Sequence, residues 1–117
     1  MAPASDPYFI QSYGDGGFRV NEEDYIGSII VARDAVYPWP IKAFADISPD
    51  SFDKLTDTGI LLIGTGNTFI FLDPKLRATL SARGLSADAM NTGAACRTFN
   101  VLLAEDRPVI AALIAVD

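Results

Sequence analysis

The sequence predicts a three-layer α/β protein with a central mixed, mostly parallel sheet. The C-terminal half, residues 59–114, alternates apolar runs with helix-like segments in the order β-α-β-α-β. Strands that alternate with helices of 10 to 13 residues imply right-handed crossovers and a parallel sheet covered by helices. The N-terminal half instead has a cluster of turn formers between two β-prone runs, which is typical of a hairpin. We expect this hairpin region to extend the sheet or to lie over one of its faces.

The N-terminal half is expected to be rich in strands. Residues 8–13 and 17–20 flank the turn formers Gly14 to Gly17, which predicts an opening β-hairpin. Residues 25–32 are nearly continuous in apolar residues, which predicts one strand that is buried on both faces and pairs with the hairpin. Two prolines in residues 36–40 remove ladder donors, so a loop or edge is expected there. Its aromatic residues, Tyr37 and Trp39, either form a rigid display for a partner or cap the core, and capping is the ordinary role of a single tryptophan.

The rest of the chain carries clear boundary signals. Ser48, as N-cap before Pro49, predicts a short helix that ends before Gly59. Residues 60–63 predict a buried strand, and residues 69–72 are compatible with a further brief strand. The Asp73-Pro74 pair repeats the cap signal, and it predicts a helix that continues to Gly84. The remaining expected elements are a strand at 85–90, a helix with Thr92 as N-cap that continues to about residue 104, a turn at 105–108 and a last strand at 109–116.

Length and composition limit the class of protein. The 117 residues predict a single domain, 1–117, with residues 1–7 as a loose tail. A net charge of −6 argues against nucleic acid or an anionic membrane as a partner. The longest apolar run, residues 109–116, is far shorter than the roughly 20 residues of a membrane helix, so no membrane span is expected.

The single cysteine and the N-terminal residues predict the compartment. Cys96 cannot form an intrachain disulfide, which fits a reducing cytoplasm. No basic residue precedes Arg19, so neither a signal peptide nor a mitochondrial presequence is recognisable. We therefore expect a cytoplasmic protein.

The absence of histidine removes the most common catalytic and metal-binding arrangements. Ser-His-Asp and Cys-His pairs and nearly all catalytic zinc sites depend on an imidazole. We nominate no catalytic residue, no metal site and no cofactor, and a non-catalytic protein is favoured over an enzyme.

Two loops are the best candidates for a binding site. Ligands of open α/β sheets gather beyond the carboxyl ends of parallel strands, where Gly64-Thr65-Gly66 and Asn91-Thr92-Gly93 are expected to face one crevice. The exposed N–H groups of the helix that starts at Gly93 suit a small anion. Gly64 to Gly66 alone are a tight turn, because the residues of a P-loop or a dinucleotide fingerprint do not follow them.

Three side chains of the helix add chemistry to this crevice. Arg97 lies near the positive end of the helix dipole, so we expect a negative partner: an anionic ligand, an acidic protein surface or, by preference, an internal carboxylate such as Asp88 or Asp106. Cys96 is either a reactive thiol or, by preference, a core residue on the apolar face of the helix. Asn100 either binds a ligand or ties the helix to a neighbouring loop.

These segments also carry a family resemblance. Residues 63–66, 88–102 and 105–114 resemble the small uncharacterised α/β proteins whose family includes the mitochondrial NADH dehydrogenase (respiratory complex I) alpha-subcomplex assembly factor and the adipogenesis-associated domain protein. The similarity covers nearly the whole chain, including Gly27, Ser28 and Trp39, and is densest between Asn91 and Leu102. The family pattern usually has glutamate at position 88 and aspartate at position 91.

The resemblance implies a three-layer fold with a central mixed sheet and no established reaction. It implies protein partners, because the mitochondrial member binds other assembly factors and early subunits. The leading hypothesis is therefore a non-catalytic interaction or assembly protein whose partners include NADH dehydrogenase assembly components. The alternative is a small-molecule anion-binding protein or enzyme that uses Gly64, Thr65, Gly66, Thr92, Gly93, Arg97 and Asn100. A third hypothesis is a redox thiol at Cys96. Without a recognisable presequence, the chain resembles the free-standing prokaryotic members of the family.

Overall fold

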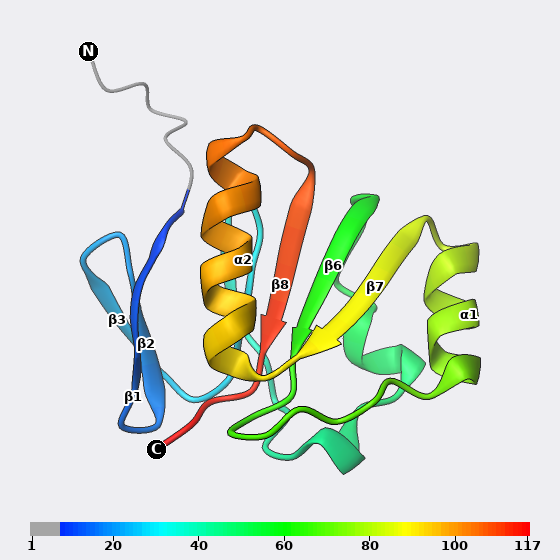
Figure 1. The fold of residues 1–117 in the computed structure, drawn as a ribbon, viewed down its shortest axis with the longest axis horizontal. Helices are drawn as coiled ribbons and strands as arrows, with labels where there is room; N and C mark the ends of the chain where they lie inside the picture. The colour runs from blue at the N-terminus through cyan, green and yellow to red at the C-terminus, as the bar shows by residue number, and fades with distance from the viewer. Residues whose placement is uncertain (1–7) are drawn as a thin grey trace.

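The computed structural model describes residues 8–117, and it contains two β-sheets and two α-helices (Figure 1). The predicted loose tail, residues 1–7, lies outside the described residues. The larger sheet has five strands in the order β5-β4-β8-β6-β7, formed by Val36–Pro38, Ile29–Val31, Val109–Leu113, Gly59–Gly64 and Leu85–Met90. The smaller sheet has the order β1-β2-β3, formed by Ile10–Gly14, Gly17–Val20 and Glu23–Ile26. The α/β class predicted from the sequence is confirmed.

Parallel pairing is confined to one half of the five-stranded sheet. Strand β6 is parallel to both β7 and β8, whereas β4 is antiparallel to β5 and β8. The expectation of a mostly parallel sheet therefore holds only for β8-β6-β7. The chain leaves β6 through α1 (Pro74–Ala82) to reach β7, and it returns through α2 (Thr92–Ala104) to β8 on the other side of β6.

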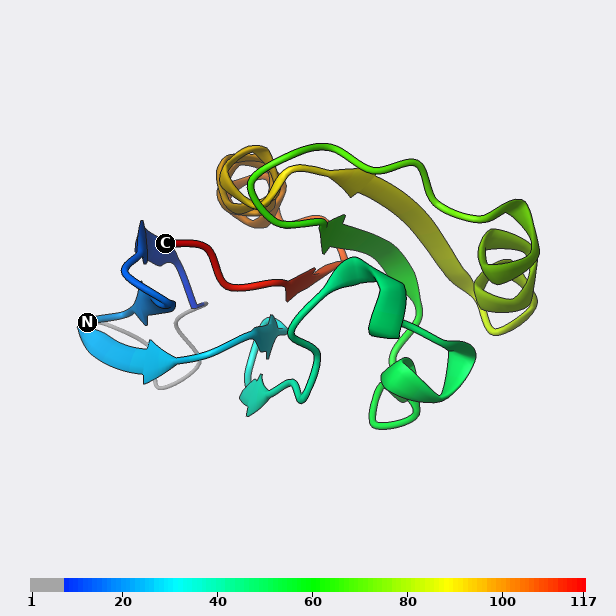
Figure 2. The ribbon, with the colours of Figure 1, turned by 90° about the horizontal axis from the view of Figure 1, so that it is seen from below.

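The two right-handed connections run in opposite directions across the sheet, so their helices contact opposite faces. Leu61 of β6 packs with Leu76 of α1, whereas the next residue, Leu62, packs with Phe99 of α2. Helix α2 lies over one face, while α1 lies beside β7 at one end of the other face (Figure 2). The remainder of that second face is covered by two 3-10 turns and their loops, not by a regular helical layer.

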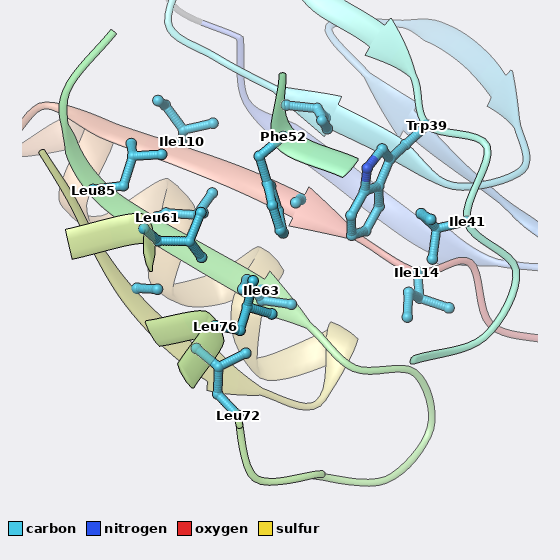
Figure 3. Packing of buried hydrophobic residues seen from close by; sticks show 14 of the residues in the cluster. Trp39, Ile41, Phe52, Leu61, Ile63, Leu72, Leu76, Leu85, Ile110 and Ile114 are labelled. Atoms are coloured by element: carbon cyan, nitrogen blue, oxygen red, sulfur yellow. The ribbon is translucent and has the colours of Figure 1, made fainter. Parts of the chain in front are cut away.

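The face that α1 and the 3-10 turns share contains an aromatic pair. The predicted helix at residues 48–55 is a 3-10 turn, Pro49–Phe52, preceded by another at Phe44–Asp46. Phe52 is fully buried, and its ring centroid lies 5.7 Å from that of Trp39 (Figure 3). The Trp39 Nε1 donates to the carbonyl of Ser51 at 2.9 Å, so the polar group of the indole is hydrogen-bonded while its ring packs against Phe52. This confirms that Trp39 caps the core.

Helix α1 and its stop follow the predicted signals closely. The Asp73 side chain accepts a hydrogen bond from Lys75 N at 3.0 Å and begins α1, and Gly84 adopts a φ of 85° just after its end. The brief strand considered at residues 69–72 is wrong, because no strand is formed there. The last strand ends at Leu113, three residues before the predicted end.

The predicted strand at residues 25–32 is divided between the two sheets. Residues 23–26 pair with the hairpin as β3, and residues 29–31 pair with β5 and β8 as β4. The change of direction occurs at Gly27, whose φ of 87° favours glycine. The next residue, Ser28, stabilises this division of the strand, because its Oγ accepts a hydrogen bond from Ala115 N at 3.0 Å. The predicted hairpin itself is confirmed as β1 and β2.

We expect Gly27→Ala to destabilise the protein by about 1 to 2 kcal/mol, because an L side chain is strained at a positive φ. A Cβ at this position meets no atom within 4 Å, so the cost comes from the backbone alone. Gly27→Asn is the matched control and should cost less, because asparagine tolerates this conformation. Urea unfolding of the three proteins measures both effects, and an equal loss for alanine and asparagine would contradict the explanation.

Candidate functional site

The loops that follow β6 and β7 are joined by backbone hydrogen bonds. Thr65 N donates to Met90 O at 2.8 Å, and Thr92 N donates to Gly66 O at 2.9 Å. The expectation that these loops meet at one edge of the sheet is therefore confirmed. Their polar groups, however, mostly bind each other, which leaves few of them for a ligand.

Thr92 connects three segments of the chain through its side chain. It is fully buried, and its Oγ1 donates to Ile114 O at 2.7 Å and accepts from Gly66 N at 3.0 Å. Thr92 is the first helical residue, and the prediction that it is the N-cap is wrong. The cap is Asn91, whose Oδ1 accepts from Ala94 N at 2.8 Å, so the threonine hydroxyl is free to bond elsewhere.

The Gly64-Thr65-Gly66 turn is shaped by packing against Thr92. A Cβ at Gly64 would lie 3.0 Å from Thr92 Oγ1, so only glycine lets the start of α2 approach β6 this closely. Thr65 is buried, and its Oγ1 donates to Thr68 O at 2.6 Å and accepts from Ile70 N at 3.3 Å. These bonds order the following loop, and they use the hydroxyl both as a donor and as an acceptor.

Cys96 belongs to the core beneath the smaller sheet. Its side chain is 3% exposed and lies in the apolar cluster that contains Ile10, Phe18 and Phe99. Burial raises the pKa of the thiol to about 12, and the opposing effect of the neighbouring Arg97 charge is smaller. The thiol therefore stays protonated at neutral pH, which supports the core interpretation and disfavours a reactive cysteine.

Asn100 fastens α2 to the first strand of the smaller sheet. Its Oδ1 accepts from Ile10 N at 2.9 Å, and its Nδ2 donates to Ile10 O at 2.8 Å. The amide thus pairs with a residue 90 positions away in the manner of a neighbouring strand. The expectation of a tie between the helix and another segment is confirmed, although that segment is β1 and not a loop.

Arg97 is exposed and has no carboxylate partner among residues 8–117. Its Nη1 instead donates to the hydroxyl of Tyr13 at 3.3 Å. The predicted internal ion pair with Asp88 or Asp106 is wrong, because Asp106 pairs with Arg33 at 2.8 Å and Asp88 forms no ion pair. A phenol 84 positions away gives no sequence signal that could have replaced this prediction.

Arg97 borders a shallow polar hollow of about 270 Å³ at the start of α2. The ring of Tyr13 lies directly over Gly93 and leaves no room for a Cβ there. Of the eight predicted site residues, Gly66, Gly93 and Arg97 line this hollow, whereas Gly64, Thr65, Thr92, Cys96 and Asn100 do not. The other lining residues are Tyr13, Asn67, Asn91 and Val116.

The sequence analysis also missed an exposed apolar segment. Phe69, Ile70 and Phe71 lie in the loop between β6 and α1 and are 48%, 39% and 82% exposed. The Phe69 and Phe71 rings pack edge to face, with centroids 4.7 Å apart. The signal was present, since four large apolar residues, 69–72, lie between the turn at Gly66 and the Asp73 cap, but it was interpreted as a strand.

Within residues 8–117, no cluster of three or more histidine, cysteine, aspartate or glutamate residues is arranged to hold a metal ion. The helices in this part of the chain are too short or too polar to span a membrane.

These features define a class of small mixed α/β proteins with two sheets and two helices, whose strand ends are closed by internal hydrogen bonds. The chain belongs to the family described as protein of unknown function (DUF498/DUF598), whose profile matches residues 10–114. This confirms the family resemblance seen in the sequence.

Among curated relatives, the NADH dehydrogenase [ubiquinone] 1 alpha subcomplex assembly factor 3 of Xenopus tropicalis is 34% identical over 91% of this chain. The chain spans only 60% of the length of that relative. An uncharacterised protein of Rhodobacter capsulatus is 35% identical, with 90% of this chain and 82% of the relative covered.

Solved structures show the same fold. A Bartonella henselae structure, described as an outer membrane protein, is 38% identical with a TM-score of 0.87, and the match covers 97% of this chain and 98% of that one. A Mth938-like domain of Bordetella pertussis is 30% identical with a TM-score of 0.83, over 98% and 90% of the two chains. The chain therefore has a Mth938-like fold.

We expect Thr92→Val to destabilise the protein by about 2 to 4 kcal/mol, because it leaves Gly66 N and Ile114 O buried without their partner. Valine keeps the shape of the side chain, so the loss reports the hydroxyl. Thr98→Val on the same helix is the control and should change stability by less than about 0.5 kcal/mol, since that side chain is only half buried. Urea unfolding gives both values, and similar effects at the two positions would argue against the role of Thr92.

We expect the buried thiol to make stability depend on alkaline pH. The unfolded chain loses the Cys96 proton above about pH 9, whereas the folded protein keeps it to about pH 12. The unfolded state then binds fewer protons, so the free energy of unfolding falls by about 1.4 kcal/mol per pH unit in this window. Cys96→Ala removes this contribution, and the stability difference between the two proteins should shift accordingly from pH 8 to pH 11. A constant difference would contradict the burial of the thiol.

Proposed function

We propose that this chain is a non-catalytic protein-binding factor that acts in the assembly of NADH dehydrogenase. The main support is the sequence similarity to the assembly factor of Xenopus tropicalis, which extends over 91% of this chain. The human assembly factor of the same name is 30% identical over 95% of the chain. Because the chain spans about 60% of these relatives, the proposal concerns the domain that they share.

The chemistry at the strand ends is compatible with binding and offers little for catalysis. The Thr65 and Thr92 hydroxyls and the Asn100 amide are committed to internal hydrogen bonds. The Cys96 thiol is buried, and its pKa is raised to about 12. Binding of a small anion would depend on the exposed Arg97 and the backbone at Gly93. The N–H groups of Gly66 and Ala94 already donate to Thr92 Oγ1 and Asn91 Oδ1. We therefore place the anion-binding alternative second.

We also propose that the protein acts in the cytoplasm, where the peripheral parts of a bacterial NADH dehydrogenase would meet a factor of this kind. The single buried cysteine is compatible with a reducing compartment.

Deletion of the gene in the source organism should lower the amount of fully assembled NADH dehydrogenase. Native gels stained for NADH oxidation would measure the complex, and succinate-driven respiration is the control that should stay unchanged. Expression of the wild-type chain from a plasmid should restore the complex. Normal assembly in the deletion strain, together with no NADH dehydrogenase subunit bound to the tagged chain, would refute the proposal.

A further inference from the structure

The loop between β6 and α1 displays apolar side chains in an ordered form. It crosses the carboxyl ends of the parallel strands on its way to α1 (Figures 1 and 2). Thr65 Oγ1 binds both Thr68 O and Ile70 N, so the turn that carries the aromatic residues is braced from inside the core. The edge-to-face packing of Phe69 and Phe71 further restricts their rotamers. An ordered apolar surface loses less conformational entropy on binding, which favours recognition of a partner.

An unpaired cation lies at the same end of the sheet. Asn67, two residues before Phe69, lines the hollow that Arg97 also lines. Arg19, Arg33 and Arg83 each pair with an aspartate, whereas Arg97, like Arg77 and Arg107, has no carboxylate within the part of the chain that the structure describes. A carboxylate from another molecule would complete the environment of Arg97.

We propose that Phe69, Ile70, Phe71 and Arg97 form the protein-docking surface of this chain, and that its occupant is a partner segment with apolar side chains next to an Asp or Glu. The inference rests on the proposed function and names the surface and the chemistry through which it acts. Aromatic residues and arginine are the types that dominate protein interfaces, and the carboxylate complements Arg97.

Two other occupants fit the surface less well. An anionic membrane would require several basic residues around the aromatic rings, whereas the chain has a net charge of −6. A second copy would have to offer a carboxylate to Arg97 and at the same time place two aromatic loops together.

The test uses the tagged full chain in cells that lack the gene, with the photo-crosslinker p-benzoylphenylalanine placed at position 71. Position 26 is the matched control, because Ile26 is an apolar residue of the smaller sheet that is 95% exposed. We expect crosslinks from position 71 to an NADH dehydrogenase subunit or a second assembly protein, and none from position 26. Because both residues are exposed, their replacement leaves the core intact.

Substitutions then measure the contribution of each part of the surface. Phe71→Ser and Arg97→Glu should each lower the amount of copurified subunit by at least about fivefold, as expected for interface anchors. Ile26→Ser and Arg107→Glu are the controls for lost apolar surface and reversed charge, and they should retain wild-type capture. Replacement by lysine of the partner's Asp or Glu that lies next to the segment crosslinked from position 71 should restore capture by the Arg97→Glu chain. If no such replacement restores capture, the assignment of a carboxylate is overturned.

The remaining outcomes separate this inference from the proposed function. Subunits that copurify but crosslink only at position 26, or at neither position, would overturn the surface and leave the function intact. A crosslink between two copies of the chain, or flotation with phosphatidylglycerol vesicles that Phe71→Ser abolishes, would identify a different occupant and overturn the inference. If no subunit copurifies with any version of the chain, the proposed function fails and this inference fails with it.

Discussion

The hydroxyl of Thr92 is the point on which the arrangement of the strand ends depends. It joins the turn after β6, the start of α2 and the residue that follows β8, using one donated and one accepted hydrogen bond. Thr92 is fully buried, so its two bonds replace the hydrogen bonds to water that Gly66 N and Ile114 O lose on folding. Gly64 allows this approach because it has no side chain, and Asn91 allows it because it caps the helix in place of the threonine. Three neighbouring small or polar residues thus have separate roles that composition alone does not distinguish.

The C-terminal half was predictable because each of its boundaries carries a local signal. Asp73 and Pro74 begin α1, Gly84 follows its end, and the strands between the helices are short apolar runs. The N-terminal half lacked such signals at its most important point. The residues around Gly27 form one apolar run in the sequence, yet they serve two sheets, because β4 finds its partner in β8 more than 75 positions later. Pairing over that separation leaves no trace in a local pattern.

The candidate site was predictable in position and less so in its contacts. Cys96 was assigned to the core correctly because helical spacing places it on the apolar face of α2. For Asn100, the tie to another segment was one of two alternatives that the sequence left open. Arg97 was assigned to a carboxylate because carboxylates are the usual partners of arginine. Its guanidinium instead donates to the hydroxyl of Tyr13 in the smaller sheet. The ordered aromatic loop was missed for a different reason, since an apolar run in a short segment is expected to be buried. Its exposure follows from the length of the connection that must cross the strand ends before α1 begins.

The pairing of Asn100 with Ile10 also bears on how the molecule avoids associating with itself. An edge strand with free backbone groups is a template for the same strand of a second copy, and the amide occupies those groups on β1. The larger sheet has β5 and β7 as its edge strands. Pro38 lacks a backbone donor at the end of β5, and the Arg77 guanidinium donates to the carbonyl of Ala87 on β7. Side chains and a proline therefore remove pairing groups at one or two positions on each of these three edge strands. At the positions that they occupy, these contacts oppose the addition of a strand from a second copy.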